Sequence, residues 1–217
     1  MTARVIADDD TGREEAIAVL RRGGIVGLPT DTVYGIGVAL DAPRGIERLF
    51  EAKDRPPDKA IMLLLSDPEQ ATDVAVFGPA ARVLAAAGWP GGLTLVLPQR
   101  GGSGLPAILT AGTATIGVRV PDHPSPRALA AAVGPFPVTS ANRSGRPTAA
   151  TAQAILAELG DALDLILDGG PARGERPSTV IDCSTERPRL LRDGAIPAAA
   201  LAAVLDEAEL PHDLPRV

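Results

Sequence analysis

The chain has 217 residues, a formal net charge of −6 and a pI near 5.0. A chain of this length buries about 70% of its unfolded surface, so a core forms without disulfides or metal, and we expect one domain. The acidic balance argues against a protein whose whole surface binds nucleic acid, and the five aromatic residues leave little material for stacking bases. Any contact with nucleic acid is therefore expected to be local or indirect.

The single cysteine, Cys183, excludes an intramolecular disulfide framework and any CxxC metal or redox motif. It follows Val180 and Ile181, which are typical of a strand, so we predict an inert, buried thiol. The N-terminus lacks the basic head and long apolar run of a signal peptide, and no stretch of about 18 uncharged apolar residues follows. These features predict a cytoplasmic protein without a membrane segment.

The first predicted elements are a helix and a strand. Thr11 and Glu14 form a T-x-x-E capping box, an apolar stripe follows, and the glycine pair at 23–24 ends the helix. Residues 25–28 then form a short apolar strand. The predicted strand leads into LPTDTVYGIG, residues 28–37, which we interpret as the floor of a site.

That interpretation depends on three polar residues, Thr30, Asp31 and Thr32, which stand where the strand leaves the core. Gly35 and Gly37 allow another group to approach the backbone closely. The alternative is that these side chains only satisfy turn amides, as such residues often do.

The remaining chain alternates short helical and apolar segments. We predict helices at 43–53, 66–76, 79–87, 127–133, 151–159 and 197–208, and strands at 61–65, 93–97, 116–120, 138–139, 165–167, 179–181 and 190–191. Residues 99–104 read as a flexible loop, and 211–217 as a frayed tail. This pattern predicts an α/β domain with a twisted mixed sheet and flanking helices.

Familiar catalytic templates are absent from the sequence. There is no G-x-x-x-x-G-K, H-E-x-x-H or G-x-S-x-G, and no G-x-G-x-x-G follows a strand. The only histidines, His123 and His212, lie in a proline-rich loop and in the tail, so a Ser-His-Asp triad is improbable and we expect both to face solvent.

Isolated polar residues instead mark the ends of several predicted strands. They are Thr30, Asp31 and Thr32; Lys53, Arg55 and Lys59; Thr115 and Arg119; Thr139, Ser140 and Asn142; Ser178 and Thr179; and Arg192. Because ligands of open α/β sheets bind at the strand ends, we expect these groups to form one site. Cations combined with hydroxyls suit a phosphate or carboxylate ligand.

Each of these residues also has an ordinary explanation. Lys53, Arg55 and Lys59, taken singly, are explained as solvated surface charges. Arg119 lies inside an apolar strand, where an inward side chain must be paired, although an outward orientation stays open. The turn at 139–145 has many small donors before a helix and suits a backbone anion nest, but an ordinary Ser- and Asn-rich turn would look the same.

Seven motifs together resemble the YrdC/Sua5 family of threonylcarbamoyl-adenylate synthases. They are LPTDTVYGIG at 28–37, KDRP at 53–56, WPGGLTLVLP at 89–98, TIGVRVPDHP at 115–124, TSANRSGRPT at 139–148, STVID at 178–182 and LLRDGAI at 190–196. They occur in the family's order and cover most of residues 20–197. The resemblance implies a YrdC-like domain at 1–205 around a large concave cavity, with a C-terminal tail at 206–217.

The resemblance also implies an activity. L-threonine, bicarbonate and ATP would condense to threonylcarbamoyl-AMP and pyrophosphate, with Mg²⁺ accompanying the triphosphate. Downstream threonylcarbamoyl-transferase proteins would then modify adenosine 37 of tRNA. No residue is assigned as catalytic; Lys53, Arg55 and Arg119 would position the substrates, and no residue is named as a metal ligand.

Site residues follow from the matching motif positions. The resemblance implies L-threonine binding by Thr32, Arg119, Thr139 and Ser178. It implies ATP binding by Lys53, Arg55, Lys59, Thr115, Ser140, Ala141, Asn142, Ala149 and Arg192. Cations that hold a carboxylate and neutralise a triphosphate fit this division, with positioning supplying most of the catalysis.

The chain departs from the family pattern at several positions. After the KDRP loop it has Ala60, Ile61 and Leu64 where many members have Pro-Leu and some a histidine. Gly92 replaces the last proline of WPGP, and Arg176-Pro177 replaces a hydrophobic-Glu pair. These departures put one threonine contact and the substrate preference in question. Its length is similar to that of the short family type, which lacks the additional C-terminal domain.

Two other functions remain open from sequence. One is a module of the same fold that binds tRNA or a nucleotide without turnover. The other is a related carbamoyl-adenylating enzyme that uses another amine or carbamoyl phosphate. Salt-dependent tRNA binding would favour the first, and activity without threonine would favour the second.

Overall fold

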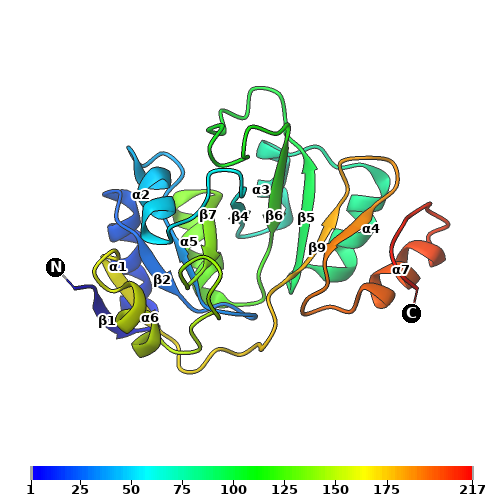
Figure 1. The fold of residues 1–217 in the computed structure, drawn as a ribbon. Helices are drawn as coiled ribbons and strands as arrows, with labels where there is room; N and C mark the ends of the chain where they lie inside the picture. The colour runs from blue at the N-terminus through cyan, green and yellow to red at the C-terminus, as the bar shows by residue number, and fades with distance from the viewer. Residues whose placement is uncertain (1, 217) are drawn as a thin grey trace.

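The computed structural model describes residues 2–216 and contains one ten-stranded mixed sheet in the order β1-β8-β2-β3-β7-β4-β6-β5-β9-β10. The strands are β1 (Arg4–Ala7), β2 (Val26–Leu28), β3 (Gly35–Gly37), β4 (Met62–Leu64), β5 (Leu93–Pro98), β6 (Thr115–Arg119), β7 (Phe136–Ser140), β8 (Leu165–Asp168), β9 (Thr179–Asp182) and β10 (Arg189–Arg192). The helices are α1 (Asp10–Arg21), α2 (Gly45–Ala52), α3 (Pro68–Val74), α4 (Pro79–Gly88), α5 (Pro124–Val133), α6 (Ala152–Leu159) and α7 (Ala198–Glu207). The predicted twisted mixed sheet with flanking helices is confirmed (Figure 1).

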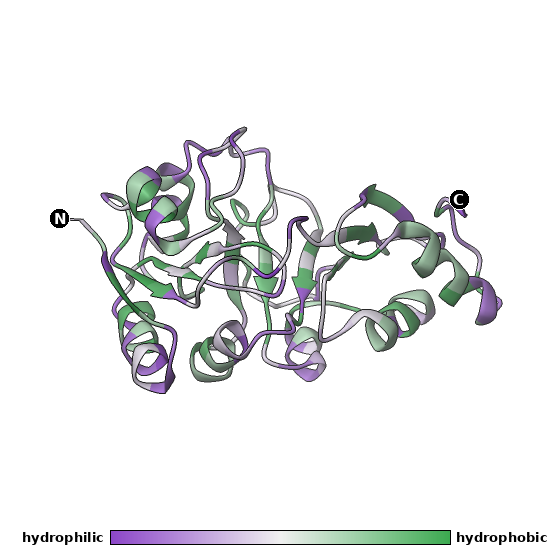
Figure 2. Ribbon diagram, turned by 90° about the horizontal axis from the view of Figure 1, so that it is seen from below, coloured by the Kyte–Doolittle hydropathy of each residue, from purple (hydrophilic) through white to green (hydrophobic). Residues whose placement is uncertain are grey.

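Helices cover both faces of the sheet at the end that contains β1, β8 and β2 (Figure 2). The side chains of β8 contact the helices on both faces. Leu165 and Leu167 belong to one core cluster with α1 and α5, whereas Ile166, between them, belongs to the other cluster with α2 and α6. Successive side chains of a strand point to opposite faces, so a continuous apolar run is required where both faces are covered. No described helix is long and apolar enough to cross a membrane.

Two helices begin earlier than predicted. Helix α1 is capped by Asp9, whose Oδ1 accepts a hydrogen bond from the Gly12 amide at 2.8 Å, so the capping box at Thr11 is wrong. Helix α5 begins at Pro124 rather than at residue 127. Proline is tolerated in the first helical turn because its missing amide has no partner there. Strands β1 and β3 were not predicted; β3 lies within the motif that we interpreted as a site floor.

The histidines and the tail also differ from expectation. His123 and His212 are each only 4% exposed, so their predicted solvent role is wrong. His123 caps α5 by accepting from the Ser125 amide at 3.3 Å. The tail is not frayed: Leu214 is buried, and Asp213 pairs with Arg187 at 2.6 Å. The last predicted tail residue, 217, lies outside the described part of the chain. Cys183 is buried as predicted, and burial raises its thiol pKa to about 12.

One long connection matters for the site. β8 and β9 lie near opposite ends of the sheet, and the segment between them, residues 169–178, crosses the molecule (yellow to orange in Figure 1). It is fixed where it passes the TDTVYG turn: the Gly174 amide donates to the Thr32 carbonyl at 2.8 Å, and the Tyr34 hydroxyl donates to the Gly170 carbonyl at 2.6 Å. This strap, residues 169–178, therefore supports the turn from outside.

Candidate active site

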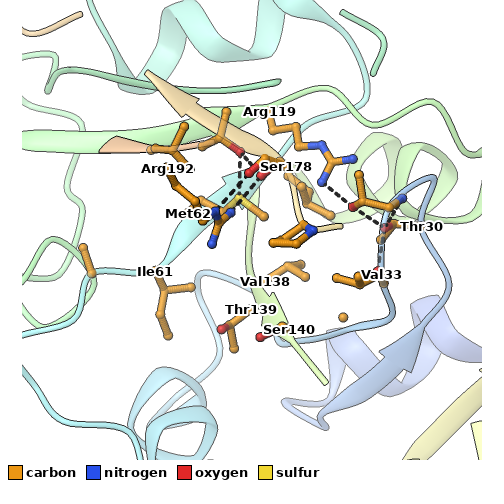
Figure 3. A pocket seen from close by; sticks show the side chains of 18 of the residues that line it. Thr30, Val33, Ile61, Met62, Arg119, Val138, Thr139, Ser140, Ser178 and Arg192 are labelled. Carbon is orange, nitrogen blue, oxygen red and sulfur yellow. Dashed lines mark hydrogen bonds between the residues drawn. The ribbon is translucent and has the colours of Figure 1, made fainter. Parts of the chain in front are cut away.

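A pocket of about 390 Å³ lies on one face of the central strands (Figure 3). Alternate residues of β6, namely Thr115, Gly117 and Arg119, line it together with residues from β4, β5, β7 and β9. The registers explain this grouping because Leu64 pairs with Arg119 and Val96 with Gly117, and paired residues share a face. The expectation that the site lies in a crevice at the strand ends is therefore wrong in part, because β6 lines the pocket along its whole length.

Arg119 is the most constrained side chain of the pocket. It is 2% exposed, and its guanidinium is held by three acceptors from two segments of the chain. Its Nε donates to the Gly91 carbonyl at 2.9 Å, its Nη1 to Thr32 Oγ1 at 2.9 Å, and its Nη2 to Asp31 Oδ1 at 2.6 Å. Burial lowers the pKa of Arg119, and the Asp31 carboxylate opposes that shift. The inward orientation, which the sequence left open, is confirmed.

The turn after β2 supplies a small hydroxyl network. Thr30 Oγ1 donates to the Val33 carbonyl at 2.6 Å and lies 3.1 Å from Thr32 Oγ1. It also accepts from the Thr32 amide at 3.1 Å, so the alternative that Thr30 satisfies turn groups is correct for this residue. Thr32 faces the pocket and Arg119. A Cβ atom on Gly174 would lie 2.6 Å from the Thr32 carbonyl oxygen, so only glycine fits beneath this turn.

A second polar cluster joins β5, β9 and β10. The Oγ atoms of Thr94 and Ser178 lie 2.8 Å apart, and Thr94 Oγ1 also lies 3.3 Å from the thioether sulfur of Met62. Arg192 donates from Nε to the Ser178 carbonyl at 3.0 Å and from Nη2 to Ser178 Oγ at 3.1 Å (Figure 3). Burial, followed by repulsion from Arg119, lowers the pKa of Arg192. Two cations therefore face one pocket, which favours an anionic ligand.

Arg55 contributes a third cation at the pocket wall. Its Nε donates to the Lys59 carbonyl at 3.0 Å and its Nη2 to the Ala60 carbonyl at 2.6 Å, and its guanidinium lies 5.9 Å from the centre of the Phe50 ring. Burial lowers the pKa of Arg55. These contacts hold the guanidinium within a loop that two prolines rigidify.

Lys53 is placed differently from the other cations. It is 1% exposed and does not line the pocket. Its ammonium donates to the carbonyls of Ser140 and Asn142 and lies 3.5 Å from Asn142 Oδ1. Burial, followed by repulsion from Arg55, lowers the pKa of Lys53 to about 7. Lys53 thus stabilises the 139–148 turn through hydrogen bonds to its backbone carbonyls.

The residues predicted to bind threonine all line this pocket: Thr32, Arg119, Thr139 and Ser178. Of those predicted to bind ATP, Arg55, Thr115, Ser140 and Arg192 line it, whereas Lys53, Lys59, Ala141, Asn142 and Ala149 do not. Lys59 is exposed, and Asn142 is buried, with its Nδ2 donating to the Arg143 and Arg146 carbonyls at 2.8 and 2.7 Å. Their contacts with a nucleotide stay predictions.

Sequence reasoning did not single out Thr94 and Thr148, two polar residues that line the pocket. It included Asp31 among the expected site residues but did not predict that Asp31 pairs with Arg119. Thr94 could have been found, because a threonine that alternates with leucines in a buried strand must face a polar environment. The pairing of Asp31 with Arg119 had no local signal, since the two lie 88 positions apart.

The departures from the family pattern are distributed around the pocket rather than gathered at one place. Ala60 and Leu64 line its apolar side. Gly92 lies close to the C-terminal segment, where an added Cβ would approach the Ala195 Cβ to 2.8 Å. Pro177 lines the pocket, while the exposed Arg176 pairs with Asp193 at 2.8 Å. The positive charge beside Ser178 is therefore partly neutralised.

The described residues include no group of three or more His, Cys, Asp or Glu side chains that could hold a metal ion. Asp31 contacts the pocket only through its ion pair with Arg119. Within the described range, 2–216, the side chains therefore form no carboxylate cage for a divalent ion.

Comparison with known proteins gives relatives across most of the chain. A threonylcarbamoyl-AMP synthase of Bacillus subtilis is 36% identical over 92% of this chain and 58% of its own length. One of Chromohalobacter salexigens is 37% identical over 77% of this chain and 90% of its own. The crystal structure of Pyrococcus abyssi Sua5 complexed with L-threonine has a TM-score of 0.87 and 33% identity, covering 98% of this chain and 62% of that one. The chain thus spans about three fifths of the length of the longer relatives.

The family profile Sua5_yciO_yrdC, described as telomere recombination, matches residues 18–194. This range includes every strand except β1 and all the segments that form the pocket. The chain therefore belongs to the Sua5/YciO/YrdC family.

Proposed function

We propose that this protein condenses L-threonine, bicarbonate and ATP to threonylcarbamoyl-AMP and pyrophosphate. The observation that carries the proposal is the convergence of Thr32, Arg119, Thr139 and Ser178 on one pocket. They come from four separate segments, and two further cations, Arg55 and Arg192, line the same pocket. The names of the relatives in Bacillus subtilis and Chromohalobacter salexigens agree with this activity.

In the proposed reaction, the pocket first orients two anions. The carboxylate of threonine binds the fixed guanidinium of Arg119, and the hydroxyls of Thr32 and Ser178 lie close enough to contact the rest of the amino acid. Arg55 and Arg192 bind the triphosphate and offset its negative charge, since a planar guanidinium donates two parallel hydrogen bonds to phosphate oxygens. Both substrates are thereby held next to each other. The loss of translational entropy then occurs on binding and does not add to the barrier of the reaction step.

The chemistry then has two steps. The threonine amine, after losing a proton, adds to CO₂ derived from bicarbonate and forms a carbamate. A carbamate oxygen attacks the α-phosphorus of ATP in line, the bond to the β-phosphate breaks, and pyrophosphate leaves with its negative charge stabilised by the arginines. We assign no protein residue as acid or base.

The proposal extends to the fate of the product. We propose that a downstream threonylcarbamoyl-transferase protein passes the group to adenosine 37 of tRNA and that this takes place in the cytoplasm. The single cysteine suits a reducing compartment. With a net charge of −6, we place any direct tRNA contact in a local patch.

The test is pyrophosphate release from ATP, with L-threonine and bicarbonate each present or omitted. We expect release only with both, and its loss in Arg119→Ala. Arg82→Ala is the matched control, because Arg82 is exposed on α4 and outside the pocket. Release without threonine would indicate a related adenylating enzyme, and nucleotide binding without release would indicate a binding module.

A further inference from the structure

Asp31 stands behind the pocket rather than in it. Its carboxylate Oδ1 lies 2.6 Å from Arg119 Nη2, and its side chain is 14% exposed. It is absent from the pocket lining, whereas its neighbours Thr30 and Thr32 line the pocket. Asp31 therefore reaches any ligand only through the guanidinium of Arg119.

The donors of Arg119 can be counted. A guanidinium has five N–H groups and cannot accept a hydrogen bond. Among the described residues, Gly91, Thr32 and Asp31 accept one each, from Nε, Nη1 and Nη2. One N–H therefore remains on each terminal nitrogen, and a carboxylate bound bidentately needs two such donors.

We propose that Asp31 is a positioning residue, which holds Arg119 so that these two remaining donors grip the carboxylate of the amino acid substrate. The inference rests on the proposed function. It adds that the acidic residue of the TDTVYG turn sets the affinity for threonine while leaving that for ATP unchanged.

Two opposing effects decide the sign of an Asp31 substitution. The carboxylate of Asp31 repels an incoming carboxylate, which alone would weaken binding. It also fixes a buried guanidinium that would otherwise turn toward other acceptors and would need ordering at each binding event. Because Arg119 stands between the two carboxylates and attracts both, we expect the positioning effect to be the larger.

Burial also makes Asp31 the natural partner for Arg119. Burial lowers the pKa of Arg119, and both the charge and the hydrogen bond of Asp31 raise it again. The Gly91 carbonyl and the Thr32 hydroxyl are neutral, so Asp31 is the one formal counter-charge in this set of three acceptors. Asparagine keeps the shape and an acceptor oxygen but removes the charge.

The test measures L-threonine and ATP dissociation constants by calorimetry on the full chain, in Asp31→Asn and in the matched control Asp122→Asn. Asp122 is an exposed carboxylate in the loop after β6, and no ion pair involves it among the described residues. We expect Asp31→Asn to weaken threonine binding by about tenfold or more while ATP binding changes less than about twofold. In turnover, KM for threonine should rise far more than kcat falls.

Unchanged or tighter threonine binding in Asp31→Asn would overturn the inference, and tighter binding would show that Asp31 competes with the substrate. If Asp31→Asn loses ATP binding as well, Asp31→Glu decides: it restores the charge, so threonine affinity should recover, and equal weakness in both variants refutes positioning. Threonine binding that depends on Asp31 without pyrophosphate release would refute the synthase activity and leave the inference standing. Pyrophosphate release by the parent protein, together with unchanged threonine binding in Asp31→Asn, would support the synthase activity and refute the inference about Asp31.

Discussion

The buried lysine gives the most quantitative prediction. Lys53 donates to the Ser140 carbonyl, and its Nζ lies 2.5 Å from the Asn142 carbonyl oxygen, with no carboxylate of residues 2–216 in direct contact. Burial lowers its pKa from the ordinary 10.5 to about 7, while Arg55 adds to the shift and Glu158 opposes it. Lys53→Met keeps the apolar length of the side chain and removes the titration.

The sign follows from proton binding in the two states. Between the folded and unfolded pKa values the unfolded chain binds more protons, so the stability contributed by Lys53 rises with pH. It is fully present above the unfolded value and is lost as pH falls through about 7. From about pH 7 to about pH 9 the native state releases about half a proton more than the unfolded chain, and integration yields about 2 kcal/mol.

The assay is urea unfolding of the parent and of Lys53→Met at several pH values across this window. Subtracting the unfolding free energies of the two proteins cancels the titration of all other groups. The variant also leaves the Ser140 and Asn142 carbonyls without a donor, but this cost does not vary with pH and so does not change the slope of the difference against pH. We expect the parent to gain about 2 kcal/mol over the variant with rising pH. A pH-independent difference would mean that the carbonyl contacts keep Lys53 fully charged, and the reasoning would be refuted.

Three further predictions concern the pocket. In Arg119→Lys the ammonium has only three donors, so both hydrogen bonds that face the substrate are lost. At about 1.5–3 kcal/mol for each bond, kcat/KM for threonine should fall about 10²–10⁴-fold. A change below about threefold would contradict the assignment. Thr94→Val keeps the shape but removes one of the two hydrogen-bond partners of the Ser178 hydroxyl, so KM for threonine should rise about fivefold with about 1 kcal/mol lost in urea unfolding. Gly174→Ala places a Cβ against the Thr32 carbonyl and should cost about 1–3 kcal/mol of stability while raising KM for threonine; unaltered unfolding would show that the strap yields.

Local sequence patterns were sufficient for most elements. The apolar run 165–167 predicted a strand, and the structure buries that strand on both faces. The helix predicted at 151–159 is α6, with Thr151 as the residue that caps it. Strand β3 escaped prediction because its glycines show no alternation. Its place in the sheet depends on pairing with β2 and β7, of which β7 lies about a hundred residues away.

The chain's own sequence identified candidate anion-binding residues, because an arginine that points inward from an apolar strand must be paired, and hydroxyl-bearing residues gather in the TDTVYG turn. Only the tertiary structure decided how they act. It turned Lys53 away from the pocket toward carbonyls, placed Thr94 beside Ser178, and paired Asp31 with Arg119 across 88 positions. Propensity and alternation act over a few residues, whereas strand order and register set which distant side chains share one face, and the pocket is built from those distant pairs.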